Sequence, residues 1–395
     1  MDQKLPNGFS DTATENEIRD AVSHFEELLR EQLNRQARIA ADTAPRDFHE
    51  PGRQIRIGLI DGDGIGPIIM REARRVLDSL LASEIACGQV QLCTIEGLTI
   101  ENRLALGKTV PDDTLAAIRT CDVFLKGPTT TPKGGTVESA NVTLRRELDL
   151  YANVRPVRVP EENIDWTFFR ENTEGEYTLG SRGIAFPGSL SMDFKVITDA
   201  GTRRIARAAY EFARNNGKQR VAVVTKANIM KKTDGMFSRI AHEIAAEYPE
   251  IETEEYYIDI MTANLVNPAV RSRFQVFLLP NLYGDILTDE AAQIQGGVGT
   301  AGSANIGDHC AMFEAIHGSA PRKMEAGEGE YANPTSILRA AEMLLRHIGM
   351  SERADILSNT IEQAEKDVHI TGHRDGATCA AFGDRMLAIL SEGKR

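Results

Sequence analysis

Three acidic residues in the second half of the chain have the type and spacing of a divalent-metal site. Asp285 and Asp289 lie four residues apart in the segment 281–290, and Asp259 precedes them. On a helix, this spacing puts both carboxylates on one face, one turn apart. Converging carboxylates repel each other unless a cation lies between them, and oxygen-only ligands suit Mg²⁺ or Mn²⁺. The alternative is a polar helix start, where an acid interacts favourably with the helix dipole.

Three arginines in a short span could bind the anion that such a metal would share. Arg145, Arg155 and Arg170 follow a polar pair, Ser139 and Asn141. A guanidinium group binds carboxylates in a bidentate way. Three of them beside a polar pair therefore indicate a site for a polycarboxylate substrate. The alternative is that they form surface ion pairs with the nearby acids Glu147, Asp149 and Glu171.

Alternating strand and helix patterns must position these residues. The apolar run 55–60 predicts a strand, which leads through a glycine-rich turn into a helical pattern at 68–81. The dinucleotide-binding fingerprint fails here because Pro67 stands where its last glycine should be. Further strand patterns at 221–224 and 276–279 place the chain in the α/β class. A chain of 395 residues is too long for one ordinary core, so we expect two domains.

The overall charge limits the partners that the chain could have. A net charge of −13 and a pI near 5.2 argue against nucleic acid and against an anionic membrane. No apolar run is long enough to span a membrane. An anionic substrate must therefore be attracted by a local basic pocket. The five cysteines show no Cys-x-x-Cys spacing, which is typical of reduced thiols and predicts a cytoplasmic protein.

The first 53 residues are predicted to form a helical extension and a linker. Apolar residues fall at helical spacing between charges over residues 14–41, which predicts a helix, and residues 43–52 read as a linker. Acidic residues close to the N-terminus argue against a transit peptide. The helix either packs on its own subunit or forms an arm that contacts a partner. The apolar residues are Ile18, Val22, Phe25, Leu29 and Leu33.

Several short motifs occur in a fixed order from about Ile55 to the C-terminus. They are 62–67, 126–132, the arginine segments, 226–230, 281–290 and 317–321. In this order they resemble the β-decarboxylating dehydrogenases, the family of isocitrate and 3-isopropylmalate dehydrogenases, and isocitrate dehydrogenases most. Each motif alone is a weak signal, whereas their joint occurrence is a strong one.

The resemblance implies an α/β fold that differs from the Rossmann fold and has two domains. Residues 54–150 and 296–395 would form a large domain on the cofactor side, and residues 151–295 a small domain. Part of the small domain, about residues 175–200, would form the clasp of a homodimer with shared active sites. The active site would lie in the cleft between the domains.

The resemblance also assigns roles to individual residues. Asp285 and Asp289 would bind the metal together with Asp259 of a neighbouring subunit. Lys226, also from the neighbour, would take the substrate's hydroxyl proton, and Tyr177 would protonate the enolate. The substrate would be bound by Ser139, Asn141, Arg145, Arg155 and Arg170. The cofactor would contact Lys126, Thr130, Asn228, His317, Gly318, Ser319, Ala320 and Asn333.

The implied reaction is the oxidative decarboxylation of isocitrate, a tricarboxylate, to 2-oxoglutarate, with Mg²⁺ or Mn²⁺ and a nicotinamide cofactor. Ser139 and Asn141 match the Ser-x-Asn pair of the isocitrate-using members, although Glu138 puts an acid close by. Arg322 and Lys323 favour NADP, but residues 371–379 lack a Tyr and Arg pair for its 2′-phosphate, so we favour NAD. The alternatives are homoisocitrate or 3-isopropylmalate as substrate, or a non-catalytic regulatory subunit.

Overall fold

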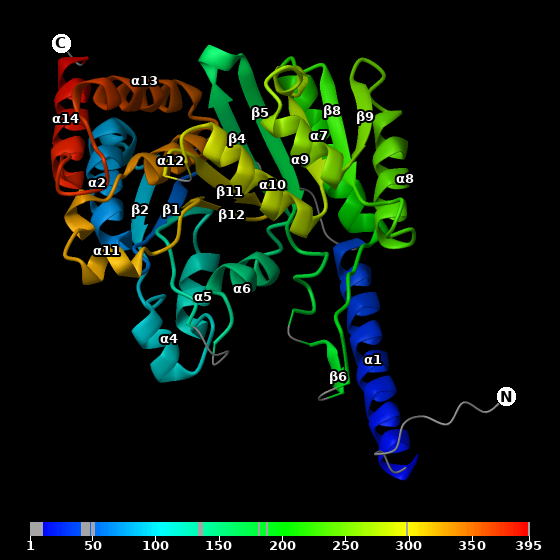
Figure 1. Cartoon of the computed structure of the whole chain (residues 1–395). Coiled ribbons are helices and arrows are strands. Elements are labelled where there is room, and N and C mark those ends of the chain that lie inside the picture. The colour runs from blue at the N-terminus through cyan, green and yellow to red at the C-terminus, as the bar shows by residue number, and fades with distance from the viewer. Residues whose placement is uncertain are drawn as a thin grey trace.

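The computed structural model describes residues 11–40, 48, 52–132, 137–180, 182–186, 189–297 and 299–393. Their centre is one ten-stranded sheet with the order β2-β1-β3-β12-β11-β4-β5-β10-β8-β9. Helices pack on both of its faces, as expected for the α/β class (Figure 1).

One half of the sheet is built from the two ends of this chain. There β2, β1, β3 and β12 are parallel to one another, and β11 is antiparallel to β12. The bounds are β1 (Ile55–Ile60), β2 (Val90–Thr94), β3 (Val123–Lys126), β11 (Gly302–Ile306) and β12 (Ala311–Ala315).

The other half comes from the middle of the chain. Here β5, β10, β8 and β9 are parallel, while β4 joins the two halves by antiparallel pairing with both β11 and β5. The bounds are β4 (Ala152–Val159), β5 (Ile164–Glu171), β8 (Arg220–Thr225), β9 (Glu252–Tyr257) and β10 (Val276–Leu279).

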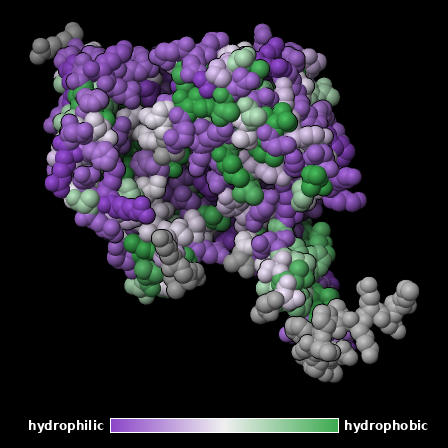
Figure 2. Space-filling view, viewed as in Figure 1, coloured by the Kyte–Doolittle hydropathy of each residue, from purple (hydrophilic) through white to green (hydrophobic). Residues whose placement is uncertain are grey.

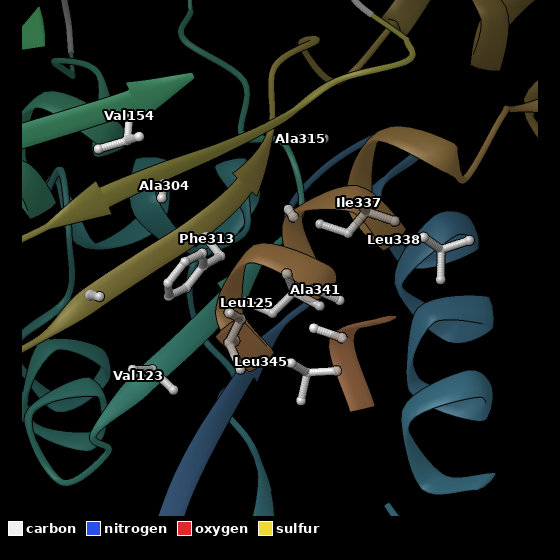
Figure 3. Packing of buried hydrophobic residues seen from close by; sticks show 14 of the residues in the cluster. Val123, Leu125, Val154, Ala304, Phe313, Ala315, Ile337, Leu338, Ala341 and Leu345 are labelled. Carbon is white, nitrogen blue, oxygen red and sulfur yellow. The ribbon is translucent and has the colours of Figure 1, made fainter. Parts of the chain in front are cut away.

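The first face of the sheet carries one continuous apolar core. Figure 3 shows part of it, where side chains of the central strands meet those of helix α12 (Thr335–His347). The helices that contribute buried residues to this core are α2 (Gly66–Leu80), α7 (Asp199–Asn215), α8 (Thr233–Ala245), α12 (Thr335–His347), α13 (Ser351–Asp367) and α14 (Cys379–Glu392).

The second face carries two separate apolar clusters. One lies beneath α9 (Ile258–Val266) and α10 (Asn281–Ile294), and the other beneath α5 (Asp112–Arg119) and α6 (Ala140–Glu147). The polar residues of the candidate site occupy the strands between these two clusters. Short helices also connect the elements: α3 (Ala82–Ala86), α4 (Ile100–Leu106) and α11 (Pro321–Glu325).

Helix α1 (Asp11–Ala40) confirms the helix predicted at 14–41 and projects from the body beside the hairpin of β6 (Ile184–Phe186) and β7 (Leu190–Met192) (Figure 1). Leu28 is buried, and the Phe25 ring contacts that of Phe194. The helix therefore packs on its own subunit along part of its length.

Most of the predicted linker, residues 43–52, lies outside the described residues. No described helix is long and apolar enough to cross a membrane.

Candidate functional site

A row of polar side chains crosses the second face of the sheet. Lys126 on β3 is in register with Glu314 on β12, and Asn305 on β11 is in register with Asn153 on β4, which in turn faces Arg170 on β5. Because side chains alternate along a strand, the residues next to them point into the apolar core of the first face. These neighbours are Leu125, Phe313, Ala304, Val154 and Phe169.

Glu314 is the centre of the row on the β3 side. Its carboxylate lies 3.1 Å from the Lys126 ammonium and 3.2 Å from the Arg145 guanidinium. Asn141 and Asn305 also donate hydrogen bonds to it, at 3.0 and 2.9 Å. Burial works to raise the pKa of Glu314, but Lys126 and Arg145 outweigh it and lower this pKa to about 2. Glu314 therefore stays ionised and holds two substrate-binding candidates, Asn141 and Arg145, in place.

Asp285 and Asp289 lie on α10, as their spacing predicts, and both face the arginines. Arg170 forms an ion pair with Asp285, and Arg155 approaches Asp289 to 3.1 Å. Asn281 at the start of α10 accepts a hydrogen bond from Arg170 at 2.8 Å. The alternative of surface pairing is wrong for Arg155 and Arg170, which are almost fully buried and pair with α10.

Tyr177 completes this group, since its hydroxyl donates to the Asp285 carboxylate at 2.8 Å. Burial and the bond to Asp285 raise the pKa of Tyr177. Partial burial also works to raise the pKa of Asp285, but Arg170, Tyr177 and Arg155 overcome it and hold that pKa below its usual value. A protonated hydroxyl thus lies next to an ionised carboxylate.

The arginines have donors to spare for an anion. Within the described part of the chain, the buried Nε atoms of Arg145 and Arg155 have no hydrogen-bond partner. Burial, and then the charge of Arg145, lower the pKa of Arg155, and they lower that of Arg170 to about 10. Crowded, buried cations with unused donors are what a polyanionic ligand would satisfy.

Lys226 and Asp259 form a second, separate group. Their ammonium and carboxylate lie 2.6 Å apart, and the Lys226 backbone amide donates to Asp234 at 2.7 Å. The described residues contain no cluster of three or more His, Cys, Asp or Glu side chains that could hold a metal. One chain therefore does not bring Asp259 to Asp285 and Asp289, and the expected contribution of a neighbouring subunit stays a prediction.

Some of the predicted cofactor residues gather around the glycine-rich turn 61–67. The hydroxyls of Thr130 and Ser319 are 2.7 Å apart, and the Ser319 carbonyl accepts a hydrogen bond from the Ile65 amide at 3.1 Å. Gly64 has a positive φ of 58°, and a Cβ on it would lie 2.1 Å from the Ser319 carbonyl oxygen. Only glycine permits this approach. A Cβ on Gly318 would meet no atom within 4 Å, so that backbone is open to a ligand.

The other predicted cofactor residues lie at different places in the fold. His317 lies against the Gly318 carbonyl at 3.1 Å, burial lowers its pKa, and Ala320 adopts a positive φ at the start of α11. Asn333 accepts a hydrogen bond from the Thr335 amide at 2.9 Å. Asn228 is exposed on the turn after β8, and the strands β12, β11, β4, β5 and β10 separate it from Lys126.

The sequence interpretation missed Glu314, Asn153 and Asn305. A signal for the two asparagines exists, because polar residues alternate with apolar ones in 152–155 and 302–306, whereas Glu314 is a single acid in the apolar run 311–315. Ser139, by contrast, was selected and lies half-buried just before α6, where its side chain makes no cap hydrogen bond.

Comparison with known proteins gives a consistent result. The sequence profile described as isocitrate/isopropylmalate dehydrogenase matches residues 56–385. An isocitrate dehydrogenase [NADP] of Rickettsia prowazekii is 41% identical over 316 residues, which cover 78% of this chain and 62% of that relative. A probable mitochondrial isocitrate dehydrogenase [NAD] subunit alpha of Drosophila melanogaster is 36% identical over 85% of this chain and 87% of the relative. A crystal structure of isocitrate dehydrogenase from Methylococcus capsulatus matches with a TM-score of 0.76 and 36% identity, covering 85% of this chain and 99% of that one.

Proposed function

Because the chain belongs to the isocitrate/isopropylmalate dehydrogenase family, we propose that it catalyses the metal-dependent oxidative decarboxylation of isocitrate to 2-oxoglutarate with reduction of a nicotinamide cofactor. The observation that carries the proposal is the convergence of Arg155, Arg170 and Tyr177 on Asp285 and Asp289. The proposal is supported because guanidinium groups that could bind an anion, a hydroxyl that could donate a proton and two candidate metal ligands lie close together.

The polar surroundings of the arginines support a tricarboxylate substrate. Asn141 is held by Glu314 and by the Thr129 hydroxyl, which donates to its side-chain oxygen at 3.2 Å. Three guanidinium groups would bind the malate part of the substrate, and Ser139 and Asn141 would bind the third carboxylate. An isopropyl group in that place would leave the half-buried polar donors of Ser139 and Asn141 unpaired, which disfavours 3-isopropylmalate. Homoisocitrate differs from isocitrate by one methylene and is the second candidate.

The donor set fits Mg²⁺ or Mn²⁺. Asp285 and Asp289 present oxygen ligands only, and the surrounding arginines keep Asp285 ionised. We propose that these two residues and the partner's Asp259 hold the ion, with the substrate supplying further oxygens. When bound, the ion supplies Lewis-acid polarisation of the substrate hydroxyl and carbonyl oxygens.

Residues of two subunits would then move the protons. The partner's Lys226 would take the hydroxyl proton while the hydride leaves the same carbon for nicotinamide. Arg145, Arg155 and Arg170 would hold the remaining carboxylates as the β-carboxylate departs as CO₂. Tyr177 would donate its proton to the enolate carbon, at a position set by its hydrogen bond to Asp285. The product would be 2-oxoglutarate.

We propose NAD as the cofactor, with NADP as the alternative. Of the two basic residues that favour NADP, Arg322 is exposed, whereas Lys323 donates to the Gly372 carbonyl at 2.6 Å. The same loop carries Glu328, which accepts from His373 at 3.1 Å. An acid near the adenosine ribose suits the 2′-hydroxyl of NAD, whereas a 2′-phosphate needs unengaged cations. Lys126, Thr130, Ser319 and the open backbone at Gly318 would line the cofactor site.

A homodimer would complete the site and cover exposed apolar surface. Leu190 and Met192 on β7 are about half exposed, as are several apolar residues of α1. Figure 2 shows pale and green atoms of this kind where α1 and the hairpin leave the body. Apolar patches of this sort favour a protein partner, and we propose a second copy of the chain.

The test is formation of the reduced nicotinamide, followed by its absorbance with Mg²⁺ or Mn²⁺ present. Isocitrate, homoisocitrate and 3-isopropylmalate are each combined with NAD and NADP, and kcat/KM is compared. We expect isocitrate with NAD to give the highest value and a chelator to abolish the rate. A higher value for another substrate would change the assignment of Ser139 and Asn141. Tight isocitrate binding without turnover would instead identify a regulatory subunit.

A further inference from the structure

The end of β5 carries two buried carboxylates that the proposed reaction does not use. Glu171 and Glu174 are 1% and 0% exposed. The Glu171 carboxylate accepts hydrogen bonds from the backbone amides of Thr173, at 3.0 and 3.1 Å, and of Glu174, at 2.6 Å. The Thr173 hydroxyl donates to it as well, at 2.7 Å. These bonds close a tight turn that begins directly after Arg170 and leads to Tyr177.

Glu174 ties this turn to the arginine at the site. Its backbone carbonyl accepts from the Asn281 side chain at 2.9 Å, and Asn281 in turn accepts from Arg170 at 2.8 Å. Its carboxylate accepts from the Thr198 amide at 2.8 Å. A Cβ on Gly201 would lie 2.3 Å from the same carboxylate, so α7 packs directly on it. A shift of Glu174 would therefore be transmitted to Arg170 through Asn281.

Helix α1 supplies one of the cations that face these two acids. Arg35 lies 3.5 Å from the Glu174 carboxylate and donates to the Thr173 hydroxyl at 2.9 Å, and its side chain is only 15% exposed. Arg204 on α7 donates to the same hydroxyl at 3.1 Å and also pairs with Asp149 at 2.8 Å. Arg35 precedes the segment that matches the family, which starts at residue 56.

The positive charges of Arg35 and Arg204 stabilise the two buried carboxylates of this turn. Burial, and then the neighbouring Glu174, raise the pKa of Glu171, while Arg204 and Arg35 act against the rise. Two neighbouring buried acids need cations close by, because a buried charge without a partner is costly. Arg204 already shares its charge with Asp149. The N-terminal helix thus provides a counter-charge that Arg204 alone does not.

We propose that Arg35 is a positioning residue that holds the turn 171–175, and through it Arg170 and Tyr177, in the geometry that binds the tricarboxylate. This inference rests on the proposed function. Small displacements of binding groups have large effects because hydrogen-bond energies fall steeply with distance and angle. Helix α1 would then support the substrate site indirectly, by holding the turn that positions Arg170 and Tyr177, without contacting the substrate.

The test compares Arg35→Met and Arg35→Lys with Arg30→Met in the full chain. Arg30 lies on the same helix, is 73% exposed and pairs with Glu26 one turn away, so its loss serves as the matched control. We expect Arg35→Met to raise KM for isocitrate about 10-fold, the usual effect of losing one charge-assisted hydrogen bond. KM for the cofactor should stay unchanged, because Lys126, Thr130 and Ser319 lie on the β3 side of the sheet, away from the turn 171–175. Arg35→Lys should recover part of the loss, because it restores the charge without the second donor.

Hydrogen exchange gives a readout that does not depend on turnover. The amides of Thr173, Glu174 and Gly175 are hydrogen-bonded in the turn and should exchange faster in Arg35→Met than in Arg30→Met. Faster exchange with an unchanged KM for isocitrate would overturn the positioning role, as would equal behaviour of the two variants. If the wild-type chain does not turn over isocitrate, the proposed function fails. The same comparison is then made on the dissociation constant of citrate measured by calorimetry, and an unchanged constant in Arg35→Met would overturn the inference separately.

Discussion

Two lysine–carboxylate pairs in this molecule have similar geometry and opposite environments. Lys126 and Glu314 are 3.1 Å apart with 0% and 5% of their side chains exposed, whereas Lys226 and Asp259 are 2.6 Å apart with 25% and 59% exposed. Glu314 also binds Arg145, Asn141 and Asn305. Asp259 pairs with Lys226 at the surface and accepts hydrogen bonds from the backbone at the start of its own helix. Distance alone therefore does not distinguish a supporting pair from one that is free to take another partner.

The difference indicates how the site is assembled. The buried pair is built by the sheet and is complete within one chain, so it can hold the substrate-binding candidates Asn141 and Arg145 rigidly. The exposed pair costs little to break, because water and salt already weaken it. The proposed roles of Lys226 in proton exchange and of Asp259 in metal binding fit the second kind of environment. The comparison predicts opposite effects of mutations on stability and on activity.

The largest effect is expected for Lys226→Met. Loss of a general base lowers kcat by about 10²- to 10⁴-fold, while the folded state loses only an exposed pair. Steady-state kinetics and a thermal melt measure the two effects. Co-expression with Asp285→Asn, which should be inactive by itself, should restore part of the activity, because a mixed dimer has one intact site. Absence of any recovery would show that both residues act within one subunit.

The next effect is expected for Glu314→Gln, which keeps the size of the side chain and removes its charge. Lys126 and Arg145 would then be buried cations without their counter-ion, a situation that costs about 3–5 kcal/mol. Urea unfolding near neutral pH measures the change in the free energy of unfolding. Asp259→Asn is the matched control, since it is the same kind of substitution in the exposed pair. If both variants lost the same free energy of unfolding, the contrast between the buried and the exposed pair would be contradicted.

The pH dependence of stability should show the same contrast with a smaller effect. The pKa of Glu314 is lowered to about 2 from an ordinary 4.5, with Lys126 and Arg145 overcoming the effect of burial. Its ionised form thus stabilises the fold fully above pH 4.5, and this contribution, about 3 kcal/mol, is lost as the pH falls through about 2. The difference in the free energy of unfolding between wild type and Glu314→Gln should therefore decrease by this amount as the pH is lowered. If urea unfolding gave the same difference in free energy at every pH in this range, Glu314 would not be ionised in the folded state.

The smallest effect on stability is expected for Asp259→Asn. The pair with Lys226 is exposed and screened, so the melting temperature should equal that of the wild type in both low and high salt. The concentration of Mg²⁺ needed for half-maximal rate should nevertheless rise if the carboxylate binds the ion. Differential scanning calorimetry and a metal titration of the rate measure the two quantities. A clear drop in melting temperature would mean that Asp259 supports the fold.

Local patterns in the sequence predicted where helices and strands lie better than they predicted which of their residues are buried. The helix expected at 14–41 is α1, and the strand expected at 55–60 is β1. However, the apolar residues that predicted α1 are largely exposed, and Leu28 is the buried residue among the described side chains of this helix, 15–37. Helical spacing shows that an apolar face exists, whereas the residues that cover it are set by contacts elsewhere in the chain.

The candidate site shows the same division. Asp285 and Asp289 could be placed on one helical face from their spacing, because a turn of helix is a local property, and the arginines could be selected by their chemistry. Their buried partners could not. Arg145 meets Glu314 across 169 residues, and Arg35 meets Glu174 across 139.

The sequence by itself determined the α/β class, the family and the residue types of the site, because periodicity and ordered motifs are written along the chain. Only the tertiary structure decided that Glu314 centres the polar row, that Arg35 reaches the turn after β5, and that Lys226 and Asp259 stay apart from Asp285. The order and register of strands in a sheet are set by the summed packing of the whole fold, so contacts across them cannot be read from any local segment.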